Sequence, residues 1–233
     1  MTQGKVIAVI AGDIVKSKSL QDRRKKVFDG LLRAIEDARN RLEQKQCKLV
    51  FSGIYRGDSF QCALSDPRQA LWTAIFLRAE LFKLRGKGLK TDVRLGLGLG
   101  TASQWNEKNI SASDGEAFQL SGKALDLLKS AKEKYRRLYI ASPWEDANRI
   151  FSVLAVLMDA LIQRWTFAQA QALSLFLIDK AQEDTSRVLH ISQPATQNRL
   201  QTAGHFAVKE AIDFFGYLVE KQKINQGIYN PIL

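Results

Sequence analysis

Hydrophobic and polar positions follow two periods in the N-terminal part of the chain. Residues 5–11 form a short apolar run rich in valine and isoleucine, which predicts a buried strand. Over residues 20–46 the apolar positions recur at helical spacing with charged residues between them, which predicts a helix. The segments "KLVFSGIY" and "DSFQCAL" then predict two strands joined by a tight turn around residues 56–57.

The next segments continue the alternation of helices and strands. Residues 66–84 begin with Asp-Pro and predict an amphipathic helix. Residues 89–100, "LKTDVRLGLGLG", predict a strand whose glycines allow another element to approach closely. The resulting order of strands and helices is the ferredoxin-like βαββαβ pattern. A polar loop at residues 101–113 comes next.

The C-terminal part of the chain has a different pattern, which predicts helices and no further strands after residue 143. A helix at about 116–132 and a short strand at 136–142 follow the polar loop, and no strand is predicted after Pro143. Residues 144–233 are predicted to be helical, with a long apolar helix around 147–163. We therefore predict an α+β fold. A ferredoxin-like domain at residues 1–145 would be followed by an all-α domain at residues 146–233.

Composition narrows the class of protein. With 45% hydrophobic residues the chain can bury a core, and no apolar run reaches the length of a membrane span. The N-terminal "MTQGK" lacks the basic segment of a secretory signal. The two cysteines, Cys47 and Cys62, show no spacing motif. We therefore expect a cytoplasmic protein with reduced thiols and no membrane partner.

The positive charge is unevenly distributed. The net charge is +11; residues 1–150 carry 28 Lys/Arg and 17 Asp/Glu, whereas residues 151–233 carry seven of each. A positive domain favours polyanionic partners such as nucleotides and nucleic acids. Ordinary solvated helix faces, such as "RRKK" at residues 23–26, explain the excess equally well.

Two aspartates are the first candidate site. Asp13 ends the first predicted strand and Asp58 begins the third. In the predicted topology these strands are antiparallel neighbours, so the two carboxylates would meet at one edge of the sheet. Adjacent carboxylates repel each other unless a cation lies between them, and Mg²⁺ or Mn²⁺ with water and phosphate oxygens suits such a pair. Alternatively, each aspartate simply caps a turn.

Residues near the two aspartates suit a phosphate group. The backbone N–H groups that follow Asp13 lead into a helix, where an anion is favoured. Lysine and arginine side chains nearby could bind phosphate oxygens. The predicted phosphate-binding residues are Ile14, Lys16, Ser17, Lys18 and Arg56.

Four segments carry a resemblance to a known family. "VIAVIAGDIVKS", "YRGDSFQ", "VRLGLGLG" and "DGEAFQLSGKAL" follow one another within the first part of the chain. In their order and approximate spacing they resemble the SatD family of bacterial proteins. The resemblance implies an N-terminal domain and a helix-turn-helix-like C-terminal part, without a defined biochemical role. Ser59 departs from the family, which often has an acidic residue after Gly-Asp.

The same segments resemble, more distantly, class III nucleotidyl cyclases and GGDEF-type domains. This resemblance implies a cyclase-like fold, a nucleotide partner, and metal-binding roles for Asp13 and Asp58. Gln119 and Lys123 stand where the cyclases have an asparagine that orients the ribose and an arginine that stabilises the transferring phosphate. Lysine lacks the bidentate fork of arginine, and Ile54 falls near the position of the base-reading lysine. These departures argue against an efficient cyclase and leave nucleotide binding, or slow or different chemistry, open.

Residues 166–204 contain a second informative pattern. Thr166 and Ser192 are predicted N-caps of two helices, and a shorter helix at 183–189 precedes a tight turn. The pattern resembles the helix-turn-helix of sigma factors and response regulators, whose second helix reads the major groove. The resemblance implies base contacts from that helix. The predicted DNA-binding residues are Ser192, Gln193, Thr196, Gln197, Asn198 and Arg199.

Two features leave an alternative open for this segment. His190 occupies a turn position where glycine is usual, and the local charge is neutral, unlike that of most DNA-binding modules. A degenerate helix-turn-helix that serves dimerisation or partner binding therefore stays a second interpretation.

Functions of three kinds fit these patterns. A DNA-binding regulator with a cyclase-like, metal- or nucleotide-binding N-terminal domain accounts for both halves of the chain and is preferred. The alternative is a metal-dependent nucleotidyl cyclase or a related nucleotidyl or phosphoryl transferase. An interaction protein in which neither site works is a third option. Because cyclase-like domains usually place their active site at a dimer interface, a homodimer is expected in either of the first two cases.

Overall fold

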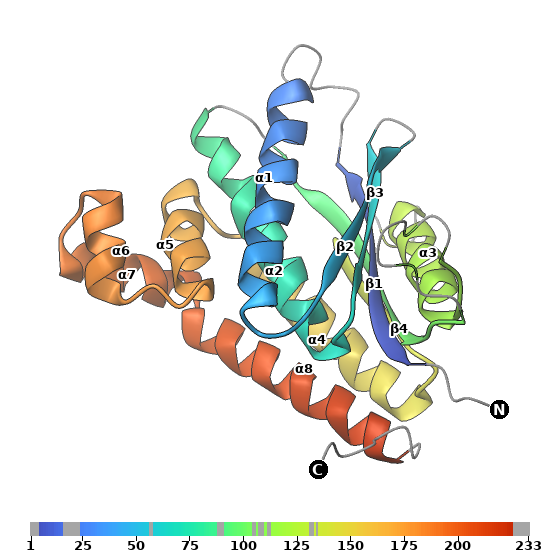
Figure 1. The fold of residues 1–233 in the computed structure, drawn as a ribbon. Helices are drawn as coiled ribbons and strands as arrows, with labels where there is room; N and C mark the ends of the chain where they lie inside the picture. The colour runs from blue at the N-terminus through green and yellow to red at the C-terminus, as the bar shows by residue number, and fades with distance from the viewer. Residues whose placement is uncertain are drawn as a thin grey trace.

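The structure is a computed structural model that describes residues 5–15, 24–55, 58–87, 91–103, 106, 110, 113–130, 133 and 135–225. A five-stranded sheet lies at its centre with helices on both faces (Figure 1), which confirms the α+β class. The strands are β1 (Val6–Ile14), β2 (Leu49–Tyr55), β3 (Ser59–Leu64), β4 (Val93–Thr101) and β5 (Leu138–Ala141). The α-helices are α1 (Arg24–Glu43), α2 (Ala70–Phe82), α3 (Glu116–Lys129), α4 (Glu145–Ile162), α5 (Phe167–Leu177), α6 (Gln182–Leu189), α7 (Gln193–Ala203) and α8 (His205–Asn225), and the 3₁₀ helices η2 (Pro67–Gln69) and η3 (Lys83–Lys87) flank α2.

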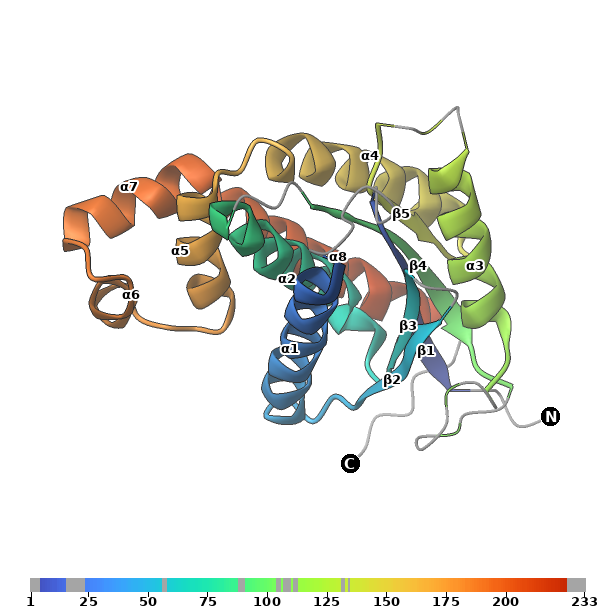
Figure 2. The ribbon, with the colours of Figure 1, turned by 90° about the horizontal axis from the view of Figure 1, so that it is seen from above.

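The strand order is β2-β3-β1-β4-β5. β1 pairs antiparallel with β3 on one side and with β4 on the other, β2 pairs antiparallel with β3, and β5 is parallel to β4. The predicted antiparallel pairing of the first and third strands is confirmed. Every residue of β1 is buried, because α1 and α2 lie over one face of the sheet and α3 over the other (Figure 2).

Glycines set the distance between α3 and β4. A Cβ atom on Gly98 would lie 2.1 Å from the carbonyl oxygen of Ala117 in α3, and one on Gly96 would lie 2.5 Å from the backbone nitrogen of Leu125. No side chain fits at these positions without moving the backbone of α3. The prediction that the glycines of this strand allow close approach is therefore confirmed.

α2 is buried on nearly all sides. We predicted an amphipathic helix over residues 66–84, and the amphipathic part of that prediction is wrong. The helix packs against the sheet, α1 and α5, so its outer face is covered as well. An all-round apolar helix is a buried helix, and the sequence "ALWTAIFLRAELF" has that composition.

An ionic cluster lies inside this helix packing. The guanidinium of Arg78 is fully buried; its Nε and Nη2 donate to the two carboxylate oxygens of Asp92 at 3.2 and 3.1 Å, and its Nη1 donates to Asp159 at 2.5 Å. The other oxygen of Asp159 accepts from the backbone N–H groups of Arg137 and Leu138 at 2.7 and 3.0 Å. The cluster therefore joins α2, the start of β4, the start of β5 and α4.

Helices α4 to α8 form the part of the chain that follows the last strand. The core between the sheet and α2 continues into α4, α5 and α8, while the predicted domain boundary near residue 145 stays a prediction. The indole N–H of Trp72 donates to the carbonyl of Leu177 at 3.0 Å, and that of Trp165 donates to the carbonyl of Ala203 at 2.9 Å. α6 and α7 lie at one end of the molecule, away from the sheet (Figure 1). Among the described helices, none has the length and apolarity needed to cross a membrane.

Candidate functional site

The structure brings the backbones of Asp13 and Asp58 together at one edge of the sheet. Asp13 is in register with Ser59 of β3, and the N–H of Ile14 donates to the carbonyl of Asp58 at 3.1 Å. The two aspartates are therefore one register position apart. That bond also uses the Ile14 amide, which we had predicted to bind phosphate, so in this conformation the amide is not available to a ligand.

Two basic side chains bind the carboxylate of Asp13, and neither was predicted to belong to the site. Asp13 is 7% exposed. Its Oδ2 accepts from Nη1 of Arg94 at 2.9 Å, and its Oδ1 lies 3.3 Å from Nζ of Lys129. Arg94 is the register partner of Asp13 on β4, and Lys129 is the last residue of α3. The charge of this carboxylate is thus compensated within the chain.

Whether a metal ion fits beside Asp13 depends on whether a phosphate group is bound with it. Carboxylates are the ligands that Mg²⁺ or Mn²⁺ prefers, but a bare divalent cation at Asp13 would lie beside Arg94 and Lys129, which repel it. A cation bound to a phosphate fits better, because the two basic side chains can then pair with phosphate oxygens. Among the residues that the structure describes, no three His, Cys, Asp or Glu side chains gather into a possible metal site. Lys16, Ser17, Lys18 and Arg56, predicted to bind phosphate, lie outside the described residues.

Gln119 and Lys123 are not brought to the aspartates within one chain. Both side chains are exposed on the outer side of α3. At 1.5 Å per residue, Lys123 lies about 9 Å and Gln119 about 15 Å along the helix axis from Lys129, which contacts Asp13. Their role at this edge of the sheet stays a prediction.

The second candidate site is the pair α6 and α7. α6 is capped at its C-terminus by His190, which adopts the left-handed conformation with φ 51°, and the N–H of Ile191 donates to the carbonyl of Ser186 at 3.1 Å. The hydroxyl of Ser192 then accepts from the N–H of Ala195 at 3.3 Å and caps α7. At the start of α5, Thr166 forms a capping box as predicted for an N-cap. Two short helices joined by a tight turn therefore follow α5.

The predicted DNA-binding residues at the start of α7 differ in exposure. Ser192, Gln193 and Asn198 are exposed, while Gln197 and Arg199 are half-buried. Thr196 is fully buried, and its hydroxyl donates to the carbonyl of Ser192 at 3.2 Å. Thr196 therefore packs inside the helical module and cannot contact a base, which corrects that part of the prediction. The remaining five residues lie around the N-terminal turns of α7.

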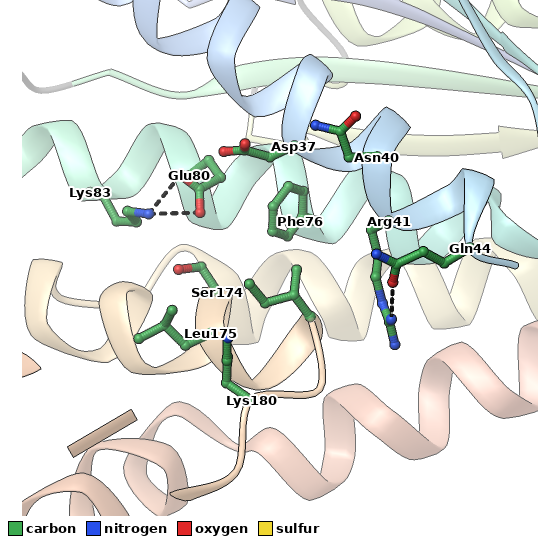
Figure 3. Close-up of a pocket in the computed structure, with 11 residues that line it drawn as sticks. Asp37, Asn40, Arg41, Gln44, Phe76, Glu80, Lys83, Ser174, Leu175 and Lys180 are labelled. Carbon is green, nitrogen blue, oxygen red and sulfur yellow. Dashed lines mark hydrogen bonds and ion pairs between the residues drawn. The ribbon is translucent and has the colours of Figure 1, made fainter. Parts of the chain in front are cut away.

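A polar pocket that the sequence did not predict lies between α1, α2 and α5 (Figure 3). Its volume is about 470 Å³. Arg41 of α1 is paired with Asp179, and Nζ of Lys83 contacts both carboxylate oxygens of Glu80 at 2.7 and 2.8 Å. The lining residues are Asp37, Asn40, Arg41, Gln44, Phe76, Glu80, Lys83, Ser174, Leu175, Ile178 and Lys180. A polar ligand here would contact both the N-terminal helices and the helix that precedes α6 and α7.

Comparison with known protein families identifies the family to which this chain belongs. A protein-family profile described as the SatD family matches residues 6–209, which is most of the chain. The chain therefore belongs to the SatD family. No curated protein matches it.

Two solved structures are similar to part of the chain. One is a bacterial light-regulated adenylyl cyclase, with 11% identity over 59% of this chain and 76% of the other, at a TM-score of 0.41. The second is the adenylyl cyclase CyaB from P. aeruginosa, with 15% identity over 55% of this chain and 83% of the other, at a TM-score of 0.35. At such identities and TM-scores, neither likeness says what this chain binds or catalyses.

Proposed function

We propose that this protein is a DNA-binding regulator of the SatD type, in which α6 and α7 form a helix-turn-helix and the ferredoxin-like, cyclase-like N-terminal domain binds a nucleotide. The observation that carries the proposal is the position of α7. It follows a turn of three residues, its N-terminus is capped by Ser192, and its exposed side chains other than Pro194 are polar. Gln, Asn and Arg are the side chains that make bidentate contacts with adenine and guanine in the major groove.

The charges of this module limit its affinity for DNA. Arg187 of α6 is held by Glu183 and Asp184, which leaves Lys180 and Arg199 as the basic side chains best placed for phosphates. Each phosphate contact contributes a slope of about −0.9 to the dependence of log K on log salt. We therefore expect weak binding by one copy, a shallow salt dependence, and a need for two copies on paired half-sites.

Fluorescence anisotropy with DNA from upstream of the protein's own gene tests the proposal, at two stated salt concentrations and with a scrambled duplex as competitor. Arg199→Ala and Gln197→Ala should each weaken specific binding by about 1–3 kcal/mol, since each base contact of this kind is worth that much. Arg33→Ala is the matched control, because Arg33 is exposed on α1, far along the chain from α7. Sequence-specific binding that survives in both α7 variants would overturn the proposal.

The adjacent backbones of Asp13 and Asp58 favour a second candidate, a metal-dependent nucleotidyl cyclase or related nucleotidyl or phosphoryl transferase. In this case Mg²⁺ or Mn²⁺ would enter together with the nucleotide, because Arg94 and Lys129 repel the ion alone. A homodimer would supply Gln119 and Lys123 from the second copy. Residues of one chain would then position the phosphates, and the metal would supply charge stabilisation.

Incubation with each nucleoside triphosphate and Mn²⁺, followed by detection of pyrophosphate or cyclic product, tests this candidate. The variant Asp13→Asn/Asp58→Asn should abolish turnover. Thermal shift should respond to Mn²⁺ with nucleotide and not to Mn²⁺ alone. Absence of turnover, or turnover that the double variant leaves unchanged, would exclude the enzyme while leaving the DNA-binding proposal intact.

A further inference from the structure

The outer face of α4 carries an apolar stripe that nothing in the described part of the chain covers. Ile150, Val153 and Leu157 are 40, 60 and 59% exposed. Their spacing of three and four residues places them on one side of the helix, and we name them the α4 stripe. The opposite side of α4 is already buried in the core. In Figure 2, α4 runs along the margin of the molecule beside β5, so this second apolar side faces outward.

Opposite charges stand at the two ends of the α4 stripe. Asp146 lies four residues before Ile150, and Arg164 lies seven residues after Leu157, so helical spacing puts both in line with the stripe. The backbone of Gln163, just before Arg164, is still helical. Both charged side chains are exposed, and neither forms an ion pair with another residue that the structure describes. The stripe therefore begins with a free negative charge and ends with a free positive one.

From this pattern we propose that the α4 stripe is a homodimerisation surface, on which a second copy of the chain packs its own α4 in antiparallel orientation. Ala155 lies midway between Asp146 and Arg164 in the sequence. With the two-fold axis at that level, Asp146 lies opposite Arg164 of the second copy. Two-fold symmetry repeats the pair, so one ion pair closes each end of the apolar seam. A parallel second copy would place like charges against each other.

The same register matches the apolar side chains by size. It places Val153 opposite Leu157 of the second copy, and Ile150 opposite Ala160, which is exposed on the same side of α4. A large side chain thus meets a small one toward each end of the seam, and two medium-sized side chains meet near its centre. Such pairing of large with small residues lets two helices interdigitate.

The apolar and charged residues have different roles in such a dimer. Exposed ion pairs contribute little affinity individually, but they select orientation and partner. Burial of the stripe on both copies supplies the affinity. Because the contact involves one helix from each copy, it belongs with the small interfaces, which form weak or transient complexes.

The proposed dimer has a geometric consequence for α7. α4 contains 18 residues, so it spans about 27 Å. Ile162, the last residue of α4, lies seven residues beyond Ala155. With the two-fold axis at that level, the two C-terminal ends, which lead into α5, α6 and α7, are about 21 Å apart along the seam. Half-sites one turn of DNA apart are separated by about 34–36 Å. The ends of α4 alone therefore do not set the half-site spacing, and the dimer itself does not depend on DNA binding.

Sedimentation velocity of the full chain over a concentration series tests the proposal. The wild type should show a reversible monomer–dimer equilibrium, and Leu157→Glu should abolish the dimer. Val188→Glu is the control, because Val188 is similarly exposed (55%) but lies on α6. Circular dichroism and thermal melting of each variant show that the fold is kept, as expected for exposed positions.

Charge reversal tests the orientation. Asp146→Arg alone and Arg164→Asp alone should each raise the dimer dissociation constant by roughly tenfold, because each places like charges together at both ends of the seam. The double variant Asp146→Arg/Arg164→Asp should restore wild-type dissociation. Arg149→Asp is the control for a change of charge on α4. Arg149 is exposed but lies about 60° around the helix from the line of Asp146, so its reversal should have a smaller effect.

Three results would each overturn the proposal. The first is a wild type that stays monomeric at every concentration, and the second is a dimer that survives Leu157→Glu. The third is a double variant that dimerises more weakly than either single charge reversal, because an antiparallel pair requires the two reversals to compensate each other.

Discussion

Replacement of Arg78 by methionine is predicted to be among the most destabilising single changes in this fold. Arg78 has no exposed surface, and Asp92 and Asp159 are nearly as buried. Burial by itself lowers the pKa of Arg78, but the attraction and hydrogen bonds of the two aspartates outweigh it and raise the pKa overall. The guanidinium is therefore charged at any working pH. Methionine fills much of the same volume but leaves two buried carboxylates without their main cation.

The magnitude follows from the partners that are lost. Removal of one side of a buried ion pair costs about 3–5 kcal/mol, out of a total of about 5–15 kcal/mol for a typical protein. For a chain of this size, each kcal/mol lowers Tm by about 2–4 °C, so Arg78→Met should lower Tm by about 6–20 °C. Asp159→Asn should cost less, about 1.5–3 kcal/mol, because Asp92 still binds the guanidinium with both oxygens.

The pH dependence separates a charge effect from a packing effect. In Arg78→Met, burial and mutual repulsion favour protonation of the two carboxylates in the folded state. The folded variant then binds more protons than the unfolded chain, so its stability falls as the pH rises. The deficit relative to wild type should therefore grow as the pH rises. A cavity or strain would give a deficit that does not change with pH.

Urea denaturation at several pH values, followed by far-ultraviolet circular dichroism, provides the assay. Arg33→Met is the control, because an exposed arginine on α1 should change stability by less than about 0.5 kcal/mol. A cost below about 1 kcal/mol for Arg78→Met, or a larger cost for Asp159→Asn, would refute the argument that the buried cation holds this cluster together.

Three further predictions concern packing, a turn and the thiols. Gly98→Ala should cost about 1–3 kcal/mol of stability, because its Cβ would meet the backbone of α3. In the control Gly122→Ala, inside α3, the new Cβ meets nothing within 4 Å, so this change should be neutral or stabilising. Equal thermal shifts for the two variants would contradict this. His190→Gly should stabilise the protein by roughly 1 kcal/mol in urea denaturation, since a left-handed φ of 51° strains any residue with a Cβ, and a net loss would show that the imidazole makes a compensating contact. Burial raises the pKa of Cys62 to about 12 and also raises that of Cys47, so iodoacetamide should label neither thiol at about pH 8 until the protein unfolds; rapid labelling of the folded protein would be inconsistent with this.

The order of elements could be predicted because local patterns determine it. The Val/Ile-rich run of β1 and the helical spacing in α1 are both present in the structure. Element ends were less accurate: the predicted helix over residues 20–46 ends at Glu43, because Lys45 and Gln46 turn back onto its last carbonyls and Gln46 adopts a positive φ of 57°. Such ends depend on single hydrogen bonds, which no periodicity reports.

The sites were predictable to the extent that topology alone fixes them. Two strands that pair antiparallel bring Asp13 and Asp58 together, and the βαββαβ pattern implies that pairing. Arg94 and Lys129 were missed because their contacts depend on the register of β4 and on where α3 ends. These are tertiary details without a local signal.

For two of the residues that were predicted wrongly or missed, the sequence does contain the relevant pattern. Thr196 was predicted to face DNA, yet it lies four residues before Leu200 and seven before Ala203, and all three are buried. That spacing defines the inner side of a helix. Arg78 was overlooked although it is the one basic residue within the largely apolar sequence of α2, and a buried charge is retained only where it is paired.

α4 is the element that mechanically links the two parts of the molecule. Asp159 holds it to α2 and to the start of β5, and Trp165, just after its end, holds the carbonyl of Ala203 at the end of α7. Both restraints lie at the C-terminal end of α4, so that end cannot shift without breaking one of these buried contacts, each of which is costly to lose. A second copy bound to the α4 stripe would therefore contact the helix whose position already determines that of α7 relative to the sheet. Dimerisation would fix the spacing of the two α7 helices without any direct contact between them.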